Sequence, residues 1–313
     1  MDELKVFTGN ANPALAQEVV DYLGMPLGKC DVFEFSNENI FVKILENVRG
    51  RDTFVIQPIC SPVQKSLVEL LIMLDALKRA SAERITAVVP YYAYGRSDKK
   101  DQPRVPITAR LVADLLTVAG ANRVLTVDLH VPQIQGFFSI PVDELTATYI
   151  LGDYFKEKDI DDLVVVAADF GISKRARDAA ARLNSPLTII EKRRTGNDDK
   201  SEALNVIGEV EGKTALIFDD EVLTGGTLVN DVLVLLEHGA KAVYFCCTHP
   251  LFAGPAIKRI NESPIKEVVV TNTVPVTDGK KLAKITVLSI APMLGEAIRR
   301  IHTGQSVGAM FEQ

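Results

Sequence analysis

The segment 215–239 combines two kinds of group that bind a phosphorylated sugar. Three acids at 219–221 follow a short apolar run and precede the sequence Thr224-Gly225-Gly226-Thr227. Apolar residues then recur at helical spacing until Gly239, which stands where a helix would end. A glycine loop at a helix N-terminus presents backbone N–H groups to an anion, and carboxylates accept hydrogen bonds from sugar hydroxyls. The segment therefore predicts a strand, an acidic turn, a phosphate loop and a helix.

Simpler interpretations of this segment stay open. Paired glycines at a strand–helix turn are common for steric reasons alone, and acids before a helix also serve as N-caps. A Walker A motif fits less well. Its tail would be Gly212-Lys213-Thr214, but these residues precede a strand and position 207 is Ile rather than Gly.

Acidic and imidazole side chains follow other expected strands. The segment Val127-Asp128-Leu129-His130 ends an expected strand, so Asp128 and His130 alternate, point to the same side and could share a divalent ion, directly or through water. A purely structural pair is the alternative. Asp169 also follows a strand, where it could bind a metal or cap the next helix, a role that Ser173 could equally fill.

Two cationic segments could hold phosphates. Glu191-Lys192-Arg193-Arg194 ends a strand and opens a long polar loop, where cations could neutralise charge that develops in phosphoryl transfer. The sequence 96–101, RSDKKD, follows PYYAYG and could bring Arg96 to a polyphosphate and an aromatic ring to a base. In both cases a solvated surface loop is the alternative.

Composition limits the class of protein. The 313 residues are enough for two ordinary domains, and a net charge of −6 argues against a general nucleic-acid binder. The chain contains no apolar run that approaches the length of a membrane span, and MDELKVF lacks the features of a signal peptide. The four cysteines form no CxxC pair, and adjacent Cys246 and Cys247 are expected as reduced thiols in a buried strand. We expect a cytoplasmic enzyme or binding protein, with no nucleic-acid or membrane partner.

Strand-like and helical runs alternate along the chain, which predicts an α/β fold with parallel sheets covered on both faces. The expected strands are 54–56, 85–90, 124–129, 163–167, 187–190, 215–218, 242–246, 268–270 and 285–288. The expected helices include one with Leu67, Leu70, Leu71, Leu74 and Leu77 on one face, one capped by Thr108 that carries Leu111, Val112, Leu115 and Leu116, and a last one near 294–301. A turn-rich stretch between Pro141 and Tyr154 suggests two domains, 1–145 and 146–313. Ligands in such sheets bind beyond the carboxyl ends of the strands, where the candidate residues fall.

Taken together, these segments resemble the ribose-phosphate diphosphokinase (PRPP synthetase) family. The likeness runs from FTGNANPALA near residue 7 to SVGAMFEQ, and its most specific segments are NVRG, DALKRASAERITAVVPYYAYGR, RVPITA, VDLHVPQIQGFF, EKRR, DDEVLTGGTL and CTHP. The resemblance implies two tandem phosphoribosyltransferase-like domains, each a mostly parallel sheet flanked by helices. It also implies transfer of the diphosphoryl group of ATP to the C1 hydroxyl of ribose 5-phosphate, with Mg2+, giving PRPP and AMP.

The same resemblance assigns roles to residues. Lys192 and Arg194 would be catalytic and would close over the transferring group. His130 and Asp169 would bind Mg2+, with Asp128 in support. The ribose 5-phosphate site would comprise Arg194, Asp219, Asp220, Leu223, Thr224, Gly225, Gly226 and Thr227. The ATP site would comprise Phe35, Asn37, Glu38, Asn39, Arg96, Ser97 and Asp98, with Phe35 stacked on adenine.

The chain departs from the family pattern at several of these positions. The usual adenine loop reads FSDGE, whereas residues 35–39 read FSNEN, so Asn37 and Asn39 replace two acids and a changed nucleotide preference or affinity is expected. Leu223 stands where many members carry Asp, Ser97 replaces the usual Gln, and residues 168–172 keep only the acid and one glycine of PDxGG.

The resemblance further implies a homohexamer built on dimers, with the adenine loop supplied by a neighbouring subunit. Two other functions stay open at this point. One is a non-catalytic relative that assembles with an active subunit, which the altered adenine loop would favour. The other is a phosphoribosyltransferase that consumes PRPP, because such enzymes share the acidic-glycine loop.

Overall fold

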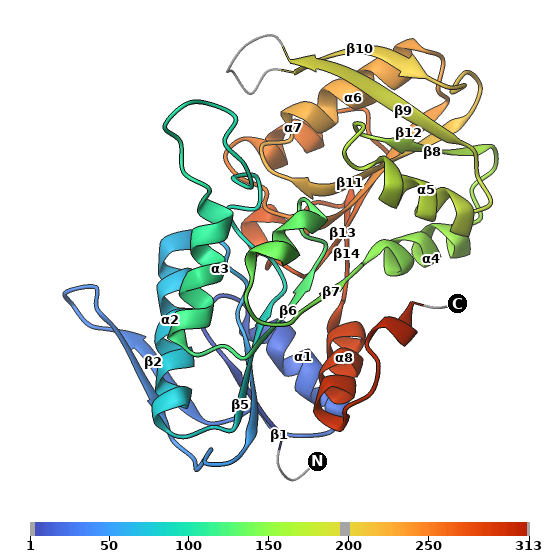
Figure 1. Ribbon diagram of the computed structural model, residues 1–313. Coiled ribbons are helices and arrows are strands. Elements are labelled where there is room, and N and C mark those ends of the chain that lie inside the picture. The colour runs from blue at the N-terminus through green and yellow to red at the C-terminus, as the bar shows by residue number, and fades with distance from the viewer. Residues whose placement is uncertain (1–3, 195–200, 312–313) are drawn as a thin grey trace. The chain divides into compact units, whose positions relative to one another are not determined.

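The computed structural model describes residues 4–194 and 201–311, and the side chains of 192–194 and 201–204 lie outside that description. The chain divides into two compact units, shown in Figure 1. The first comprises Met1–Leu145 together with Ser289–Gln313, and the second comprises Thr146–Leu288. The division at 145 matches the turn-rich stretch, but residues 289–313 group with the first unit rather than the second. Within the described residues, no helix has the length and apolar character needed to cross a membrane.

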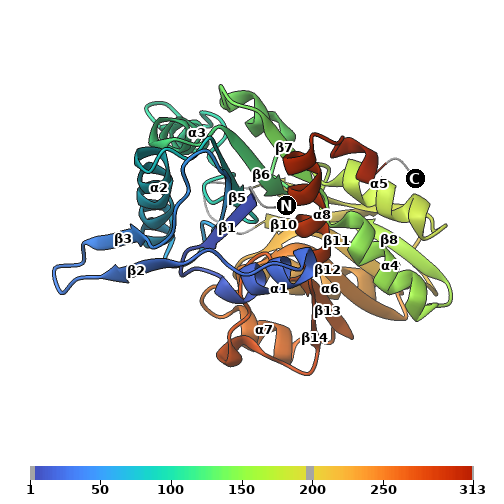
Figure 2. The ribbon, with the colours of Figure 1, turned by 90° about the horizontal axis from the view of Figure 1, so that it is seen from below.

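The first unit is built on a five-stranded parallel sheet in the order β1-β4-β5-β6-β7. Its strands are β1 (Leu4–Thr8), β4 (Asp52–Ile56), β5 (Arg84–Val89), β6 (Arg123–Val127) and β7 (Val142–Leu145). Its helices are α1 (Pro13–Leu23), α2 (Val63–Arg79), α3 (Thr108–Ala119) and α8 (Ala291–Thr303), with the short 3-10 helices η1 (Pro132–Phe137) and η3 (Gly308–Met310). The antiparallel hairpin of β2 (Cys30–Glu34) and β3 (Ile40–Ile44) projects from this unit, as Figures 1 and 2 show. The sequence patterns did not predict this hairpin.

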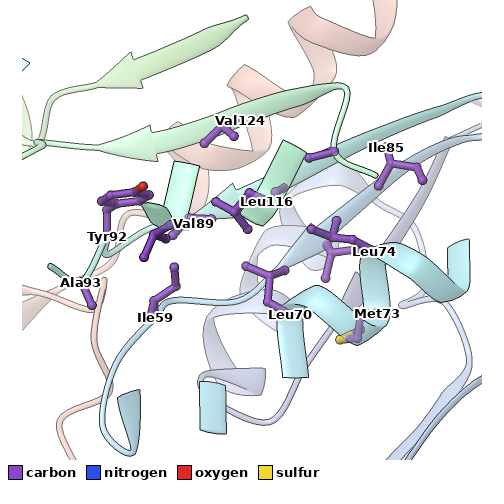
Figure 3. Close-up of a cluster of buried hydrophobic side chains, with 14 of the residues drawn as sticks. Ile59, Leu70, Met73, Leu74, Ile85, Val89, Tyr92, Ala93, Leu116 and Val124 are labelled. Atoms are coloured by element: carbon purple, nitrogen blue, oxygen red, sulfur yellow. The ribbon is translucent and has the colours of Figure 1, made fainter. Parts of the chain in front are cut away.

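The first unit buries apolar side chains on both faces of its sheet. Alternate residues of the central strands pack with α2 and α3, as Figure 3 shows for Val89 and Val124 beside Leu70, Leu74 and Leu116; Val55 and Ala87 belong to the same cluster. The opposite face carries Phe54, Val88 and Leu125, which are also fully buried, and α1 and α8 cover that face (Figure 2). Coverage of both faces is what the long apolar strands predicted.

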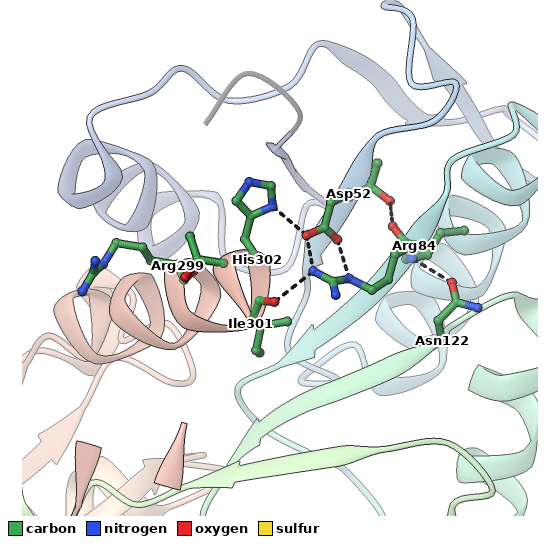
Figure 4. A network of polar contacts seen from close by, with 9 residues as sticks. Asp52, Arg84, Asn122, Arg299, Ile301 and His302 are labelled. Carbon is green, nitrogen blue, oxygen red and sulfur yellow. Dashed lines mark hydrogen bonds and ion pairs between the residues drawn. The ribbon is translucent and has the colours of Figure 1, made fainter. Parts of the chain in front are cut away.

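The last helix, α8, is held on the first unit by packing and by a polar network. Its apolar side buries Leu294 and Ile298 against the neighbouring elements, and α1 is its main partner. At its end the His302 Nδ1–H donates to the Asp52 carboxylate at 2.8 Å (Figure 4). Arg84 donates from Nε to Asp52 at 2.8 Å and from Nη2 to the carbonyl of Ile301 at 3.0 Å. The hydrogen bond to Asp52 raises the pKa of the Arg84 guanidinium, so the cation of this network is retained.

The second unit is a seven-stranded sheet in the order β10-β9-β8-β11-β12-β13-β14, in which only the edge strand β10 pairs antiparallel. Its strands are β8 (Leu163–Ala167), β9 (Leu187–Arg194), β10 (Ser201–Ile207), β11 (Thr214–Val222), β12 (Ala242–Pro250), β13 (Glu267–Thr271) and β14 (Ile285–Leu288). Its helices are α4 (Thr148–Lys158), α5 (Ser173–Arg182), α6 (Gly226–Glu237) and α7 (Ala256–Glu262), with the 3-10 helix η2 (Asp278–Lys280). Both units are therefore α/β, with mostly parallel sheets flanked by helices.

Helix α3 differs from the prediction in the residue that caps its start and in which of its apolar residues are exposed. Thr108 is the first helical residue rather than the cap, and the Oγ of Ser97 accepts a hydrogen bond from the Thr108 N–H at 3.4 Å instead. Val112 and Leu116 are buried as expected. Leu111, however, is exposed, together with Leu115 and Val118. The helix carries two apolar stripes, and only one of them can face the sheet.

Candidate active site

Three of the predicted site segments meet at one edge of the second sheet. The strands β9, β8 and β11 are neighbours, and Ala167 of β8 pairs with Ile189 of β9 and with Phe218 of β11. The carboxyl ends of parallel strands lie along one edge, so Asp169, the backbone of Lys192 and the acids at 219–221 all lie along that edge. The fold thus brings acidic and cationic residues from separate parts of the sequence to one edge of the second sheet.

The acids of the second unit lie within β11, not in a turn after it as the sequence suggested. Asp219 pairs in register with Cys247, and Glu221 with His249. The ladder continues past the apolar core because β12 is equally long and its partner residues are buried. Asp219 is half-buried and accepts a hydrogen bond from the Asp220 N–H at 2.9 Å, whereas Asp220 is only 7% exposed. Asp219 is therefore the more accessible carboxylate.

The thiols beneath these acids are inert. Cys246 and Cys247 lie fully buried in β12, as the sequence predicted. Burial raises the pKa of both thiols well above the usual value, and the Asp219 carboxylate raises each further. The two cysteines therefore pack as small apolar groups and supply no nucleophile to the site.

The glycine loop leads directly into α6, as predicted. Gly225 is the N-cap residue with φ +71°, a conformation that favours glycine, and α6 has no side-chain cap hydrogen bond. The hydroxyl-bearing residues Thr224 and Thr227 are exposed on either side of the two glycines. An uncapped helix start with exposed hydroxyls can accept the oxygens of a phosphate.

Sequence patterns missed one cation beside this loop. Arg259 of α7 donates from Nη1 to the Thr224 carbonyl at 3.1 Å. A side chain at Gly226 would begin 3.1 Å from the same nitrogen, so the guanidinium lies against the loop. The only sequence signal was a cation in the short run that follows CTHP, because the pairing of α7 with α6 is a tertiary contact.

Asp128 and His130 do not alternate on a strand, which corrects the expectation. Strand β6 ends at Val127, and Asp128 adopts φ +42°, in the left-handed region. Asp128 is buried, whereas His130 is exposed. A Cβ placed on Gly95 would lie 3.2 Å from the Cβ of His130, so the loop after β5 and the loop after β6 are adjacent. This adjacency brings the exposed Arg96 to the same edge of the first sheet as His130.

The predicted ATP residues fall in two separate places of the first unit. Ser97 and Asp98 lie in the loop that leads toward α3, beside Arg96. Phe35, Asn37, Glu38 and Asn39 form the turn of the β2–β3 hairpin. The ring of Phe35 is 49% exposed and contacts Phe33 and Phe41, with centroids 5.1 Å and 5.7 Å away.

The hairpin turn is held by its own polar groups. The Phe35 N–H donates to the Asn39 carbonyl at 2.9 Å, and the Asn39 N–H donates to the Asn37 Oδ1 at 3.2 Å. Glu38 adopts φ +67°, which suits a turn but favours glycine. The aromatic surface of Phe35 is therefore displayed on an ordered turn.

Asp169 follows β8 and remains exposed. Its Oδ1 accepts a hydrogen bond from the Ile172 N–H at 3.1 Å, which links it to the start of α5. Ser173 is the first residue of that helix and does not cap it. The two catalytic candidates Lys192 and Arg194 are placed only as backbone, in β9, and their side chains lie outside the described residues.

The donors proposed for a metal suit Mg2+ only in part. His130 and Asp169 are both exposed, but the described residues contain no cluster of three or more acid, His or Cys side chains that could hold an ion. Mg2+ in phosphoryl-transfer enzymes is commonly bound by one or two protein ligands, with phosphate oxygens and waters completing the octahedron. Each of these side chains by itself could serve as a single ligand of an ion that a polyphosphate also binds.

Two family models match the chain. Residues 4–120 match the N-terminal domain of ribose phosphate pyrophosphokinase, and residues 195–312 match the phosphoribosyl synthetase-associated domain. A ribose-phosphate pyrophosphokinase of Caldanaerobacter subterraneus is 54% identical over 99% of this chain and 98% of its own length. The Bacillus subtilis ribose-phosphate pyrophosphokinase is 50% identical over 98% and 97%.

The chain belongs to the ribose-phosphate pyrophosphokinase family. It is therefore a transferase of the nucleotide-biosynthetic kinase type, and the resemblance found in its motifs is confirmed. A solved structure, the phosphoribosylpyrophosphate synthetase of Mycobacterium smegmatis, matches with a TM-score of 0.91 and 45% identity over 96% of this chain and 99% of that one. Since these likenesses run along nearly the whole chain, a pyrophosphokinase accounts for it better than a phosphoribosyltransferase or a non-catalytic relative does.

Proposed function

We propose that this ribose-phosphate pyrophosphokinase transfers the diphosphoryl group of ATP to the C1 hydroxyl of ribose 5-phosphate, which gives PRPP and AMP. One observation carries the proposal. The half-buried Asp219 and the uncapped, glycine-initiated helix α6 stand at the edge of the sheet where β9 brings Lys192 and Arg194. A hydroxyl acceptor, a phosphate cradle and cations then lie along one edge.

The sugar phosphate would bind across the end of β11 and the start of α6. The backbone N–H groups of the loop 224–227 would hold the 5-phosphate, and Leu223 and Arg194 would border it. Asp219 and Asp220 would accept hydrogen bonds from the 2- and 3-hydroxyls. This orientation would direct C1 toward the carboxyl ends of β8 and β9, where Asp169 and Lys192 lie.

The nucleotide would bind to residues of the first unit. The exposed ring of Phe35 offers a face for the adenine, and Asn37, Glu38 and Asn39 belong to the same hairpin turn. Arg96, with Ser97 and Asp98, would bind the phosphates. Because the hairpin projects from its own unit, we propose a homohexamer built on dimers, in which the hairpin serves a neighbouring copy.

Mg2+ bound by His130 and Asp169 would neutralise part of the polyphosphate charge, and the buried Asp128 would support that site from below. The chain itself then has little covalent work. Lys192 and Arg194 would offset the charge on the equatorial oxygens of the transferring group, and the sugar site would align the C1 hydroxyl for in-line attack. Alignment of the two substrates and stabilisation of the charge on the transferring group would supply most of the rate enhancement.

The decisive assay mixes the protein with ATP, ribose 5-phosphate and Mg2+ and measures AMP and PRPP. We expect both products in equal amounts, and none when Mg2+ or ribose 5-phosphate is left out. Absence of product with every purine triphosphate would refute the proposal. Release of pyrophosphate from added PRPP and a free base, without use of ATP, would instead indicate a phosphoribosyltransferase.

A further inference from the structure

The short helix α7 forms a wall of the glycine loop. Gly225 and Gly226 both contact this helix: a Cβ on Gly225 would lie 3.4 Å from the Cα and carbonyl oxygen of Ala256, and a Cβ on Gly226 would lie 3.1 Å from the Nη1 of Arg259. The helices α6 and α7 are neighbours in the second unit (Figure 1). Helix α7 therefore borders the loop closely at both glycines, and the positive φ of Gly225 favours glycine at that position.

Arg259 controls the direction of one peptide group in the loop. Its Nη1–H donates to the Thr224 carbonyl at 3.1 Å. Because a trans peptide is planar, a carbonyl held toward α7 directs the following N–H, that of Gly225, to the opposite side. If the peptide rotated, the carbonyl dipole would turn toward a bound anion and repel it. The hydrogen bond from Arg259 therefore keeps the loop in the form that presents N–H groups.

Arg259 also changes the charge around the loop. Asp219, Asp220 and Glu221 immediately precede it and disfavour a second anion. A guanidinium has five N–H donors, and the hydrogen bond to the Thr224 carbonyl uses one of its nitrogens. The side chain is exposed, so the remaining donors are accessible to a ligand. One cation at the start of α6 offsets part of the acidic field where a phosphate dianion would sit.

We propose that Arg259 is a positioning residue of the sugar-phosphate subsite, which holds the loop 224–227 in its anion-binding form and favours a phosphorylated sugar over a neutral one. The inference rests on the proposed function, because it takes ribose 5-phosphate as the ligand of this loop. It adds a residue from α7, outside the acidic-glycine segment, to the binding of that ligand.

Steady-state kinetics of Arg259→Ala and Arg259→Lys test this role. With ATP and Mg2+ saturating, we expect Arg259→Ala to raise the KM for ribose 5-phosphate about tenfold. The kcat and the KM for ATP should stay within about twofold. Arg259→Lys should restore part of the affinity, because an ammonium keeps the charge and one donor to the carbonyl.

The matched control is Lys258→Ala. Lys258 is the adjacent cation of α7, its side chain is 77% exposed, and it pairs with Glu262 of its own helix at 4.0 Å. We expect its kinetics to equal those of the wild type. A partly unfolded Arg259 variant would lose kcat while the KM for ribose 5-phosphate stayed constant, so that pattern would overturn the positioning role.

Direct calorimetric titration with ribose 5-phosphate distinguishes a failure of the role of Arg259 from a failure of the proposed function. If the wild type binds ribose 5-phosphate and Arg259→Ala binds it equally well, the role of Arg259 is overturned while the proposed function stands. If the wild type itself neither binds ribose 5-phosphate nor makes PRPP, the proposed function fails and this inference fails with it. Weaker binding to Arg259→Ala, with ribose as a non-binding comparison, supports both.

Discussion

At the scale of single residues, Lys192 offers the sharpest test of the chemistry. It lies in β9, three positions beyond Ile189, at the carboxyl edge of the sheet where Asp219 of β11 also lies. We expect Lys192→Ala to lower kcat at least about tenfold, or ~1.4 kcal/mol, because a cation near the transferring group stabilises the transition state more than the ground state. The urea midpoint should not change.

Lys213→Ala provides the comparison for that experiment. Lys213 precedes β11, at the amino end of the sheet, and its Nζ lies 3.6 Å from the largely exposed Glu209 carboxylate. Its removal should leave kcat unaltered. If Lys192→Ala also turned over at the wild-type rate, Lys192 would have no part in the mechanism.

We predict that the hairpin turn determines which nucleotide is used. Replacing Asn37→Asp and Asn39→Glu together should change the relative kcat/KM for ATP, dATP, GTP and CTP, because two charges are added beside the exposed ring of Phe35. The turn should persist, since an Asp at 37 can still accept the Asn39 backbone N–H that Asn37 accepts at 3.2 Å. Identical kinetics for all four nucleotides would contradict our assignment of this turn to the adenine.

Some residue positions could be predicted and others could not. The loop 224–227 at the start of α6 followed from local sequence, because a glycine pair before a helical pattern leaves few alternatives. The backbone of Asp128 did not, because β6 ends two residues earlier than the expected strand 124–129 and a positive φ turns the chain. Arg259 could not be found at all without the contact between α6 and α7.

At the scale of elements, Glu267 ties β13 to α4 and to β14. Its carboxylate accepts hydrogen bonds from Tyr154 at 2.6 Å, Lys158 at 2.7 Å and Thr286 at 2.7 Å. Burial by itself would raise the pKa of Glu267, but these hydrogen bonds outweigh burial and hold that pKa below the usual value. The charged form is therefore favoured in the folded state.

The lowered pKa of Glu267 determines how the free energy of unfolding changes with pH. A carboxyl with a lowered pKa stabilises the fold above its unfolded pKa of about 4.3, and the contribution is lost as the pH falls through the folded value. We expect Glu267→Gln to reduce the free energy of unfolding by about 1 to 2 kcal/mol at pH 7. The difference from wild type should shrink as the pH falls below about 4.

Urea denaturation at several pH values measures this difference. Asp278→Asn is the control, because Asp278 is almost fully exposed and its carboxylate pairs with Lys281, which directly follows η2. Its free energy of unfolding should match the wild type throughout. A Glu267→Gln variant whose deficit stayed constant from pH 7 to the acid limit would show that lost packing, not charge, accounts for the effect.

Sequence periodicity predicted which segments are strands or helices more accurately than it predicted which of these elements pack together. The strands β8 and β14 have the bounds that were expected, because short β-branched runs between turn residues fit few other structures. Helix α3 was predicted, but the buried stripe was not, since Leu111 and Val112 lie on different stripes of equal apolar character. The choice depends on the α2 and β5 surfaces that α3 meets.

At the scale of the whole molecule, the first unit is discontinuous in sequence. Helix α8 buries Leu294, Ile298 and other apolar side chains within that unit, and His302 bonds to Asp52. We expect a fragment of residues 1–145 to unfold non-cooperatively or aggregate, because the apolar surface covered by α8 would be exposed. A fragment of residues 146–288 should unfold cooperatively.

A third fragment makes the comparison decisive. Residues 1–145 joined to 289–313 through about 15 Gly and Ser residues should regain a cooperative urea transition, since the linker only closes a flexible loop. Circular dichroism during the titration reports that transition. If residues 1–145 alone unfolded as sharply as the joined fragment, α8 would not be part of the first unit's stable core.

The amphipathic pattern of α8 predicted that one face of the helix is buried. It did not predict which of the two units that face packs against. The pattern fixes the helix and its apolar side, whereas the partner depends on contacts with α1, more than two hundred residues earlier. Sequence reasoning therefore assigned 289–313 to the unit that precedes it in the chain.

Helix α8 belongs to the first unit but is synthesised after the second unit. The ribosome completes residues 1–145 first, yet the helix that finishes their unit ends at Thr303. At about 5 to 20 residues per second, the nascent first unit must wait roughly 10 to 30 s with an apolar face uncovered, while the whole second unit emerges. The part of the enzyme whose synthesis starts first is thus the last to be completed.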